Sequence, residues 1–221
     1  GYERLSRGRG VLIMDAGMSS FTPATHAGPL SFEYAFARER IIVNCGAAAQ
    51  DPRWQRVLRA TLAHSTVTAD NRNACVLGAE GVQVTRPRVQ CLRHEDGATT
   101  LLETSHDGYA ARLGLTHHRV VRLGGMGDVL SGEDRLMGRP GVPIAARFHL
   151  HPAVSVLSCD DDAAILRAKS GALFCFRAAG GMMSVEESVY AGACTPVPSP
   201  QIVIAGLSGG PVAWELRKEQ G

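Results

Sequence analysis

The chain has 221 residues, of which 45% are hydrophobic, so it can build one large domain around a buried core. The net charge of only +2 gives no case for nucleic acid as a partner, and no apolar run reaches the ~18 residues that a membrane-spanning helix needs. Residues 1–10 lack the apolar stretch of a signal peptide and lead directly into a predicted strand. We therefore expect a fragment of a longer protein.

Short alternating or apolar runs follow one another along the chain, separated by Gly, Pro, Asp and Asn. The predicted strands are residues 10–15, 30–37, 41–44, 66–69, 81–88, 90–95, 99–106, 115–123, 129–133, 145–150, 155–159, 163–169, 173–178, 184–190, 201–205 and 212–218. Helical spacing occurs only at residues 54–62, after Asp51 as N-cap and Pro52 at the first helical position. Pro196, Pro198 and Pro200 predict an extended surface loop. The pattern predicts an all-β fold, a large antiparallel β-sandwich (a supersandwich) with one short helix near residues 51–62, in a single domain over residues 1–221.

The composition carries two further features. The six cysteines stand singly in apolar contexts, without paired spacing, and predict buried free thiols; they are Cys45, Cys75, Cys91, Cys159, Cys175 and Cys194. Only Lys169 and Lys218 are lysines among the 23 basic residues, so the others are arginines. Arginine pairs bidentately with carboxylate or sulfate, as an acidic polysaccharide would require, but a GC-rich genome explains the bias equally well.

The first predicted hairpin suggests a cluster of polar side chains. A hairpin brings the start of its first strand and the end of its second to one edge, so His26 and Asn44 should lie side by side, and the short helix can return His64 there. Two imidazoles and a side-chain oxygen suit zinc, although Asn is a neutral and weaker ligand than Asp. The alternative is two separate histidines, each hydrogen-bonded to the backbone.

Seven segments carry a resemblance to a known family. They are HAGPLSFEY from His26, IIVNCG from Ile41, RATLAHSTVTAD from Arg59, SHDGYA from Ser105, RFHLHP from Arg147, EESVY from Glu186 and QIVIAG from Gln201. In this collinear order they resemble the C-terminal domain of the heparinase II/III-like polysaccharide lyases. The resemblance covers nearly the whole chain.

The resemblance implies a β-sandwich that follows an N-terminal α/α toroid, with an active-site cleft between them. Lyases of this kind cleave uronic-acid polysaccharides by β-elimination, and the sandwich holds a zinc ion. His26 and His64 match the two histidine ligands of the family, whereas Asn44 stands where the third ligand is normally Asp. Ala24 replaces a histidine that the family places near the reacting sugar, and Gly28 replaces an aspartate. We therefore expect a weakened zinc site.

Three other residues are candidates for contact with substrate. His106 and Tyr109 lie at a strand end, where a histidine base and a tyrosine acid could project into a groove, but an ordinary turn with Tyr109 packed beneath it is the alternative. Arg59 matches an arginine of the family and would either hold its loop or meet a substrate carboxylate. With His26 and His64, these side chains are predicted to line one exposed, loop-rich edge.

Two functions follow from the resemblance. The first is the sandwich half of a polysaccharide lyase, with an acidic polysaccharide and the toroid of the same protein as partners, and with no activity in this chain alone. The second is a carbohydrate-binding or scaffold domain that kept the fold and lost the chemistry, as Ala24 and Asn44 favour. A free-standing metal hydrolase is poorly supported, because no acid or base beside the histidines can be named. A bacterial protein, periplasmic or cytoplasmic, is implied.

Overall fold

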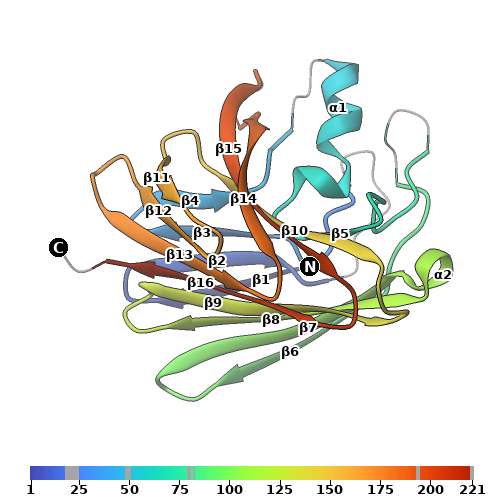
Figure 1. The fold of residues 1–221 in the computed structure, drawn as a ribbon, viewed down its shortest axis with the longest axis horizontal. Helices are drawn as coiled ribbons and strands as arrows, with labels where there is room; N and C mark the ends of the chain where they lie inside the picture. The colour runs from blue at the N-terminus through green and yellow to red at the C-terminus, as the bar shows by residue number, and fades with distance from the viewer. Residues whose placement is uncertain (18–24, 48–50, 79–80, 82, 193–194, 220–221) are drawn as a thin grey trace.

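Two antiparallel sheets packed face to face form the molecule (Figure 1). The computed structural model describes residues 1–17, 25–47, 51–78, 81, 83–192 and 195–219. Each sheet has eight strands. The predicted antiparallel β-sandwich is thereby confirmed.

The first sheet has the order β1-β2-β3-β4-β10-β15-β14, and β5 also pairs with β10. Its strands are β1 (Tyr2–Arg7), β2 (Gly10–Asp15), β3 (Phe32–Phe36), β4 (Glu39–Val43), β5 (Val67–Ala69), β10 (Pro143–Leu150), β14 (Met182–Tyr190) and β15 (Val197–Leu207). Even-numbered residues of β10 and β15 point into the sandwich, and odd-numbered ones such as His149 and Gln201 lie on the outer face.

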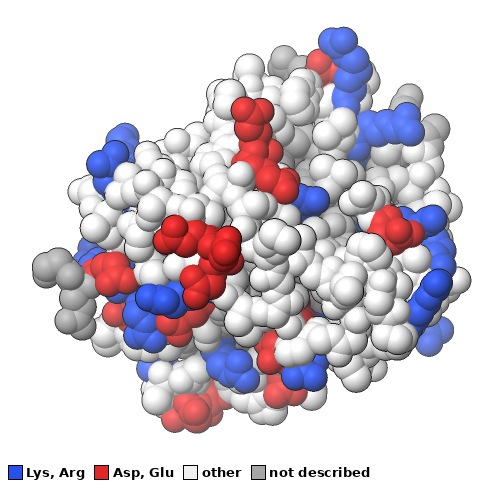
Figure 2. Space-filling model, in the orientation of Figure 1, with Lys and Arg blue, Asp and Glu red and all other residues white. Residues whose placement is uncertain are grey.

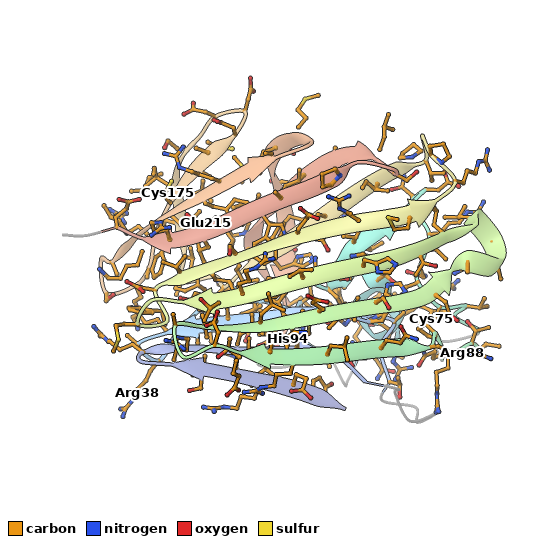
Figure 3. The ribbon with its side chains drawn as sticks, turned by 90° about the horizontal axis from the view of Figure 1, so that it is seen from below. Arg38, Cys75, Arg88, His94, Cys175 and Glu215 are labelled. Atoms are coloured by element: carbon orange, nitrogen blue, oxygen red, sulfur yellow. The ribbon has the colours of Figure 1, made fainter. Side chains whose placement is uncertain are left out.

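The second sheet has the order β11-β12-β13-β16-β9-β8-β7-β6. Its strands are β6 (Val89–Glu95), β7 (Thr99–Tyr109), β8 (Leu115–Gly124), β9 (Val129–Gly138), β11 (Ser155–Cys159), β12 (Ala163–Arg167), β13 (Leu173–Ala179) and β16 (Pro211–Lys218). Figure 3 looks onto this sheet, with Cys75 and Arg88 at one end of the sandwich and Cys175 and Glu215 at the other.

Helices contribute little to the described chain. They are α1 (Pro52–Leu58), the 3₁₀ turn η1 (Thr61–Ala63) and the single turn α2 (Ala110–Leu113). Asp51 caps α1 as predicted, because its carboxylate accepts the Arg53 N–H at 2.9 Å. None of the helices in these residues is long and apolar enough to cross a membrane. In Figure 1, α1 stands above β10 and β5 of the first sheet.

Aromatic side chains join the two sheets at the centre of the core. Phe32 stacks on Trp214 with 5.4 Å between the ring centroids, and Phe148 meets Trp214 edge to face at 5.0 Å. Phe148 also meets Phe176 at 5.0 Å. Phe32 and Phe148 belong to the first sheet and Trp214 and Phe176 to the second, so these contacts bury apolar area and fix how the sheets pack.

A buried ion pair lies beside these rings. Arg119 Nε and Nη2 donate to the Asp134 carboxylate at 2.7 and 3.0 Å, and both side chains are fully buried. Trp214 Nε1 donates to the same carboxylate at 3.0 Å. Burial alone would raise the pKa of Asp134, but the Arg119 charge and a hydrogen bond from His117 hold it well below its usual value. The pair is charged and hydrogen-bonded within the core.

Arg119 also reaches across to the first sheet. Its Nη1 donates to the carbonyls of Leu30 and Ser65 at 2.8 and 2.9 Å. Leu30 lies in the turn before β3, with a left-handed φ of 58°, and Ser65 lies just before β5. Arg119 therefore fixes the two segments that carry His26 and His64.

Two predictions about individual strands need correction. Pro198 and Pro200 lie inside β15 and not in a loop. The strand tolerates them because it pairs only with β14 at these positions, and the pairing with β10 ends at Gln201. A proline at an edge leaves no ladder hydrogen bond unmade. The strand predicted over residues 81–88 is absent from the described part of that range, which has only an isolated bridge at Gln83.

We predict that Arg119→Met lowers the free energy of unfolding by about 3–5 kcal/mol, because it leaves the Asp134 charge buried without its partner. The control is Arg135→Met, which breaks the ion pair with Glu133 on the same sheet; these side chains are 46% and 36% exposed. The control should lose about 0–1 kcal/mol. Denaturant unfolding of both variants measures the difference, and equal losses would contradict the role given to Arg119.

Candidate functional site

His26 and His64 meet at one edge of the sandwich, as the hairpin predicted. His26 Nδ1 lies 3.2 Å from His64 Nε2, and the two rings are almost perpendicular, with an interplanar angle of 87°. His64 Nδ1 donates to the Ala60 carbonyl at 2.8 Å, so the neutral His64 ring turns the lone pair of Nε2 toward His26. The prediction that both rings line an exposed edge is corrected for His64, which is only 6% exposed because His26 and the Ala60 turn cover it, whereas His26 is half-buried.

Gly28 makes room for His64. A Cβ atom on Gly28 would lie 2.6 Å from the imidazole ring of His64, closer than real contacts allow. The Thr66 hydroxyl donates to the Pro29 carbonyl at 2.9 Å and ties the two segments together beside the rings. The glycine that departs from the family pattern is thus a packing requirement in this chain.

Both imidazoles are neutral at physiological pH. Burial and the neighbouring His26 lower the pKa of His64 to about 3. Burial and the positive charge of Arg59 lower the pKa of His26. Arg59 is the C-cap residue of α1, and its carbonyl accepts the Ala27 N–H at 2.8 Å. Arg59 therefore lies beside the pair, as predicted, and its backbone holds the loop that carries His26.

Asn44 contributes to this edge by fixing the loop. Its Oδ1 accepts the Ser65 N–H at 2.9 Å, and its own N–H donates to Glu33 Oε1 at 3.2 Å. The oxygen that was predicted to face a metal thus already serves the residue next to His64. One lone pair of that oxygen is left for a further partner.

These donors fit part of a zinc site. Zinc bonds imidazole nitrogen at ~2.0–2.1 Å, so two tetrahedral ligands stand about 3.3 Å apart, close to the 3.2 Å between His26 and His64. A closed structural site needs four ligands, and the described residues contain no group of three His, Cys, Asp or Glu that could hold a metal. The spacing of the two imidazole nitrogens therefore fits two of the four ligands that such a site needs.

His106 and Tyr109 do not line this edge. His106 is 1% exposed and Tyr109 is fully buried, and the Tyr109 hydroxyl donates to the Val67 carbonyl at 2.8 Å. Burial raises the pKa of Tyr109 and lowers that of His106 far from their ordinary values. The prediction that they project into an exposed groove is corrected: β7 carries them to its covered face, and the alternative with Tyr109 packed beneath a turn holds.

The buried histidines form an ordered chain of hydrogen bonds. His106 Nδ1 accepts the Gly108 N–H at 3.1 Å, so its Nε2 carries the proton toward His117 Nδ1 at 3.2 Å. His117 Nε2 then donates to Asp134 Oδ1 at 2.7 Å. The prediction overlooked this chain, although His117 and Arg119 stand two residues apart on one strand and must share a face.

Its two packed antiparallel sheets place the chain among the β-sandwich domains, and the His26–His64 pair lies at one edge of the sandwich. The family model described as "Heparinase II/III-like, C-terminal" matches residues 1–215, and the chain belongs to this family.

Solved structures share the fold at low identity. The chain is similar to heparan sulfate lyase HepC from Pedobacter heparinus, with 15% identity and a TM-score of 0.81 over 100% of this chain and 35% of that one. It is also similar to the heparinase III BT4657 gene product, with 15% identity and a TM-score of 0.79 over 99% of this chain and 35% of that one.

A curated protein matches in sequence. The FtsZ-localized protein C of Caulobacter vibrioides is 28% identical over 248 residues, covering 100% of this chain and 43% of that protein. The chain thus spans less than half the length of this protein and of the two lyases.

We predict that the protein loses stability as the pH falls below about 6.5, the ordinary pKa of histidine. Burial lowers the pKa of His149 to about 4, so between these values the unfolded chain binds a proton that the folded chain does not. His149→Gln should flatten the dependence of unfolding free energy on pH relative to His118→Gln, at an exposed position. Equal slopes in urea unfolding series would contradict this.

Proposed function

We propose that this chain is the sandwich half of a polysaccharide-lyase-like protein and that it offers a binding edge to an acidic polysaccharide. The observation that carries the proposal is the His26–His64 pair with Arg59 beside it, on a domain of the heparinase II/III-like family. Arginine is suited to meet the carboxylate or sulfate groups of such a polymer. The half-buried His26 imidazole lies next to that charge, and the buried His64 holds it in place.

The chemistry of β-elimination is incomplete in this chain. A base must remove the proton beside the carboxylate, and an acid must protonate the leaving oxygen, both held on one sugar ring. Ala24, which lies outside the described residues, stands where the family has a histidine, and His106 and Tyr109 are buried. The base and acid would then come from the N-terminal α/α toroid that the resemblance implies.

We predict that the chain alone does not cleave heparan, chondroitin, alginate or hyaluronan, because mispositioning a catalytic group by ~1 Å already costs ~100-fold. The measurement is the ultraviolet absorbance of the unsaturated product, with the chain and with a longer protein that includes the preceding domain. Turnover by the longer protein only, abolished by replacing a tyrosine of that domain, supports the division of labour. Turnover by the chain alone would overturn it.

A second candidate is a non-catalytic binding or scaffold domain. The buried, fully hydrogen-bonded His106 favours it, as does the match over the whole chain to a protein whose name places it with FtsZ. Under this alternative the longer protein is inactive on all four polymers, whereas the chain sediments with FtsZ filaments. An active longer protein would exclude it.

We also propose that a zinc ion, where bound, uses His26 and His64, with Asn44 as a weak third ligand. Asn44→Asp should raise zinc affinity about tenfold or more, since a carboxylate supplies the charge that the amide lacks. Asn71→Asp, at an exposed position, is the control. Titration of untagged protein with zinc measures both. Stoichiometric zinc that survives His64→Ala, or an equal gain in the control, would refute the assignment.

A further inference from the structure

A cavity of about 210 Å³ lies between the α1–η1 segment and the outer face of the first sheet. Its floor includes Thr68 of β5, Arg147 and His149 of β10, and Gln201 of β15, and its other walls include Leu58 and Leu62. η1 separates the cavity from His64, because His149 Nε2 donates to the Leu62 carbonyl at 3.0 Å from this side. The cavity is therefore next to the histidine pair but distinct from it.

Unpaired polar atoms gather on this floor. Of the residues that line the cavity, Arg147 and Gln201 each have a buried atom, Nε and Oε1, with no hydrogen-bond partner among the residues that the structure describes. Both side chains lie on the outer face of β10 and β15, where Gln201 is opposite His149 and diagonal to Arg147. An unpaired buried polar atom destabilises the folded state, so such a group favours a site for a polar partner. Gln201 is 7% exposed.

His149 and Cys45, which line the cavity, form a neutral and unreactive cluster with Ser188. His149 donates through Nε2, so its Nδ1 accepts the Ser188 hydroxyl at 2.8 Å and lies 3.4 Å from Cys45 Sγ. Burial raises the pKa of Cys45 to about 11, which keeps the sulfur a thiol. A thiol is a poor nucleophile, so this cluster suits binding and not covalent chemistry.

The charges beside the cavity also cancel. Arg147 pairs with Glu186 at 3.5 Å, and Arg72 pairs with Asp70 at 3.1 Å. Figure 2 shows that basic and acidic side chains are also mixed over the wider surface, with basic side chains on α1 and acidic ones over β14. Both basic side chains that line the cavity, Arg72 and Arg147, thus already have a carboxylate partner. This favours a neutral ligand over a carboxylate or sulfate.

Backbone strain at the mouth supports a binding role. Asp70 and Asn71 both have a φ of 51°, the left-handed region that side chains other than glycine seldom occupy, and Asn71 lines the cavity. Strain of this kind gathers at ligand clamps.

We propose that this cavity binds one ring of a neutral sugar. A sugar ring carries several hydroxyl groups, each of which can accept from Arg147 Nε–H or donate to Gln201 Oε1. The C–H faces of the ring pack against Leu58 and Leu62, which supply apolar walls. This site goes beyond the proposed function, because it rests on the cavity's own atoms and requires neither the lyase chemistry nor the histidine pair.

The test is titration of the ¹⁵N-labelled chain with glucose and, as the charged match, glucuronate. We expect saturable shifts on β10, β15 and α1 with glucose, in the millimolar range that a few hydrogen bonds support, and binding of glucuronate that is about tenfold weaker. Tighter binding of glucuronate, or no saturable shift with glucose, would overturn the assignment. The polysaccharide assay is independent, so the two proposals can fail separately.

Matched variants separate binding from folding. Gln201→Leu removes the unpaired acceptor at similar size and should weaken glucose binding about tenfold. The melting temperature should change little, because the loss of the Gln201 Nε2 bond to the Glu187 carbonyl is offset by removal of the unpaired buried oxygen. Gln90→Leu, at an exposed position on β6, should keep glucose binding. Undiminished glucose binding in Gln201→Leu would refute the site. The site would also be refuted if this variant had a lower melting temperature and regained full glucose binding on cooling, because the loss would then reflect unfolding.

Discussion

The buried ion pair between Arg119 and Asp134 is the contact on which the functional edge depends. Arg119 lies on the second sheet, yet two of its hydrogen bonds go to carbonyls of Leu30 and Ser65 beside the first. A fully buried charge is tolerated only when its partner and hydrogen bonds are complete, and here the bidentate contact with Asp134 supplies them. The geometry of the histidine pair is therefore set from the opposite layer of the sandwich.

Much of the fold could be predicted from local sequence. Alternating residues and turn residues mark most strands, and Asp51-Pro52 marks the start of α1, because these signals act within a few residues. The meeting of His26 and His64 could also be predicted, since a hairpin constrains which residues share its edge. These are the features that depend on short-range geometry.

The buried polar contacts depend on which strand faces are covered by the opposite sheet. The position of His106 on β7 gives its face but not what packs there, and its partner His117 becomes visible only once β7 and β8 are paired. Asp134 and Trp214 meet because β16 pairs with β9, a neighbour distant in sequence. Such non-local pairing leaves no periodic signal, so the buried network could not be predicted while its strands could.

One short segment connects the separate parts of this end of the molecule. The carbonyl of Leu62 accepts from His149 at the cavity, His64 faces His26, and Ser65 exchanges hydrogen bonds with Arg119 and Asn44. Because Leu62, His64 and Ser65 lie within four consecutive positions, the segment cannot move far at the cavity without changing the angle between the imidazoles. Neither can it move at the histidine pair without stretching bonds to a buried arginine. The cost of those buried bonds keeps the edge in one arrangement before any ligand arrives.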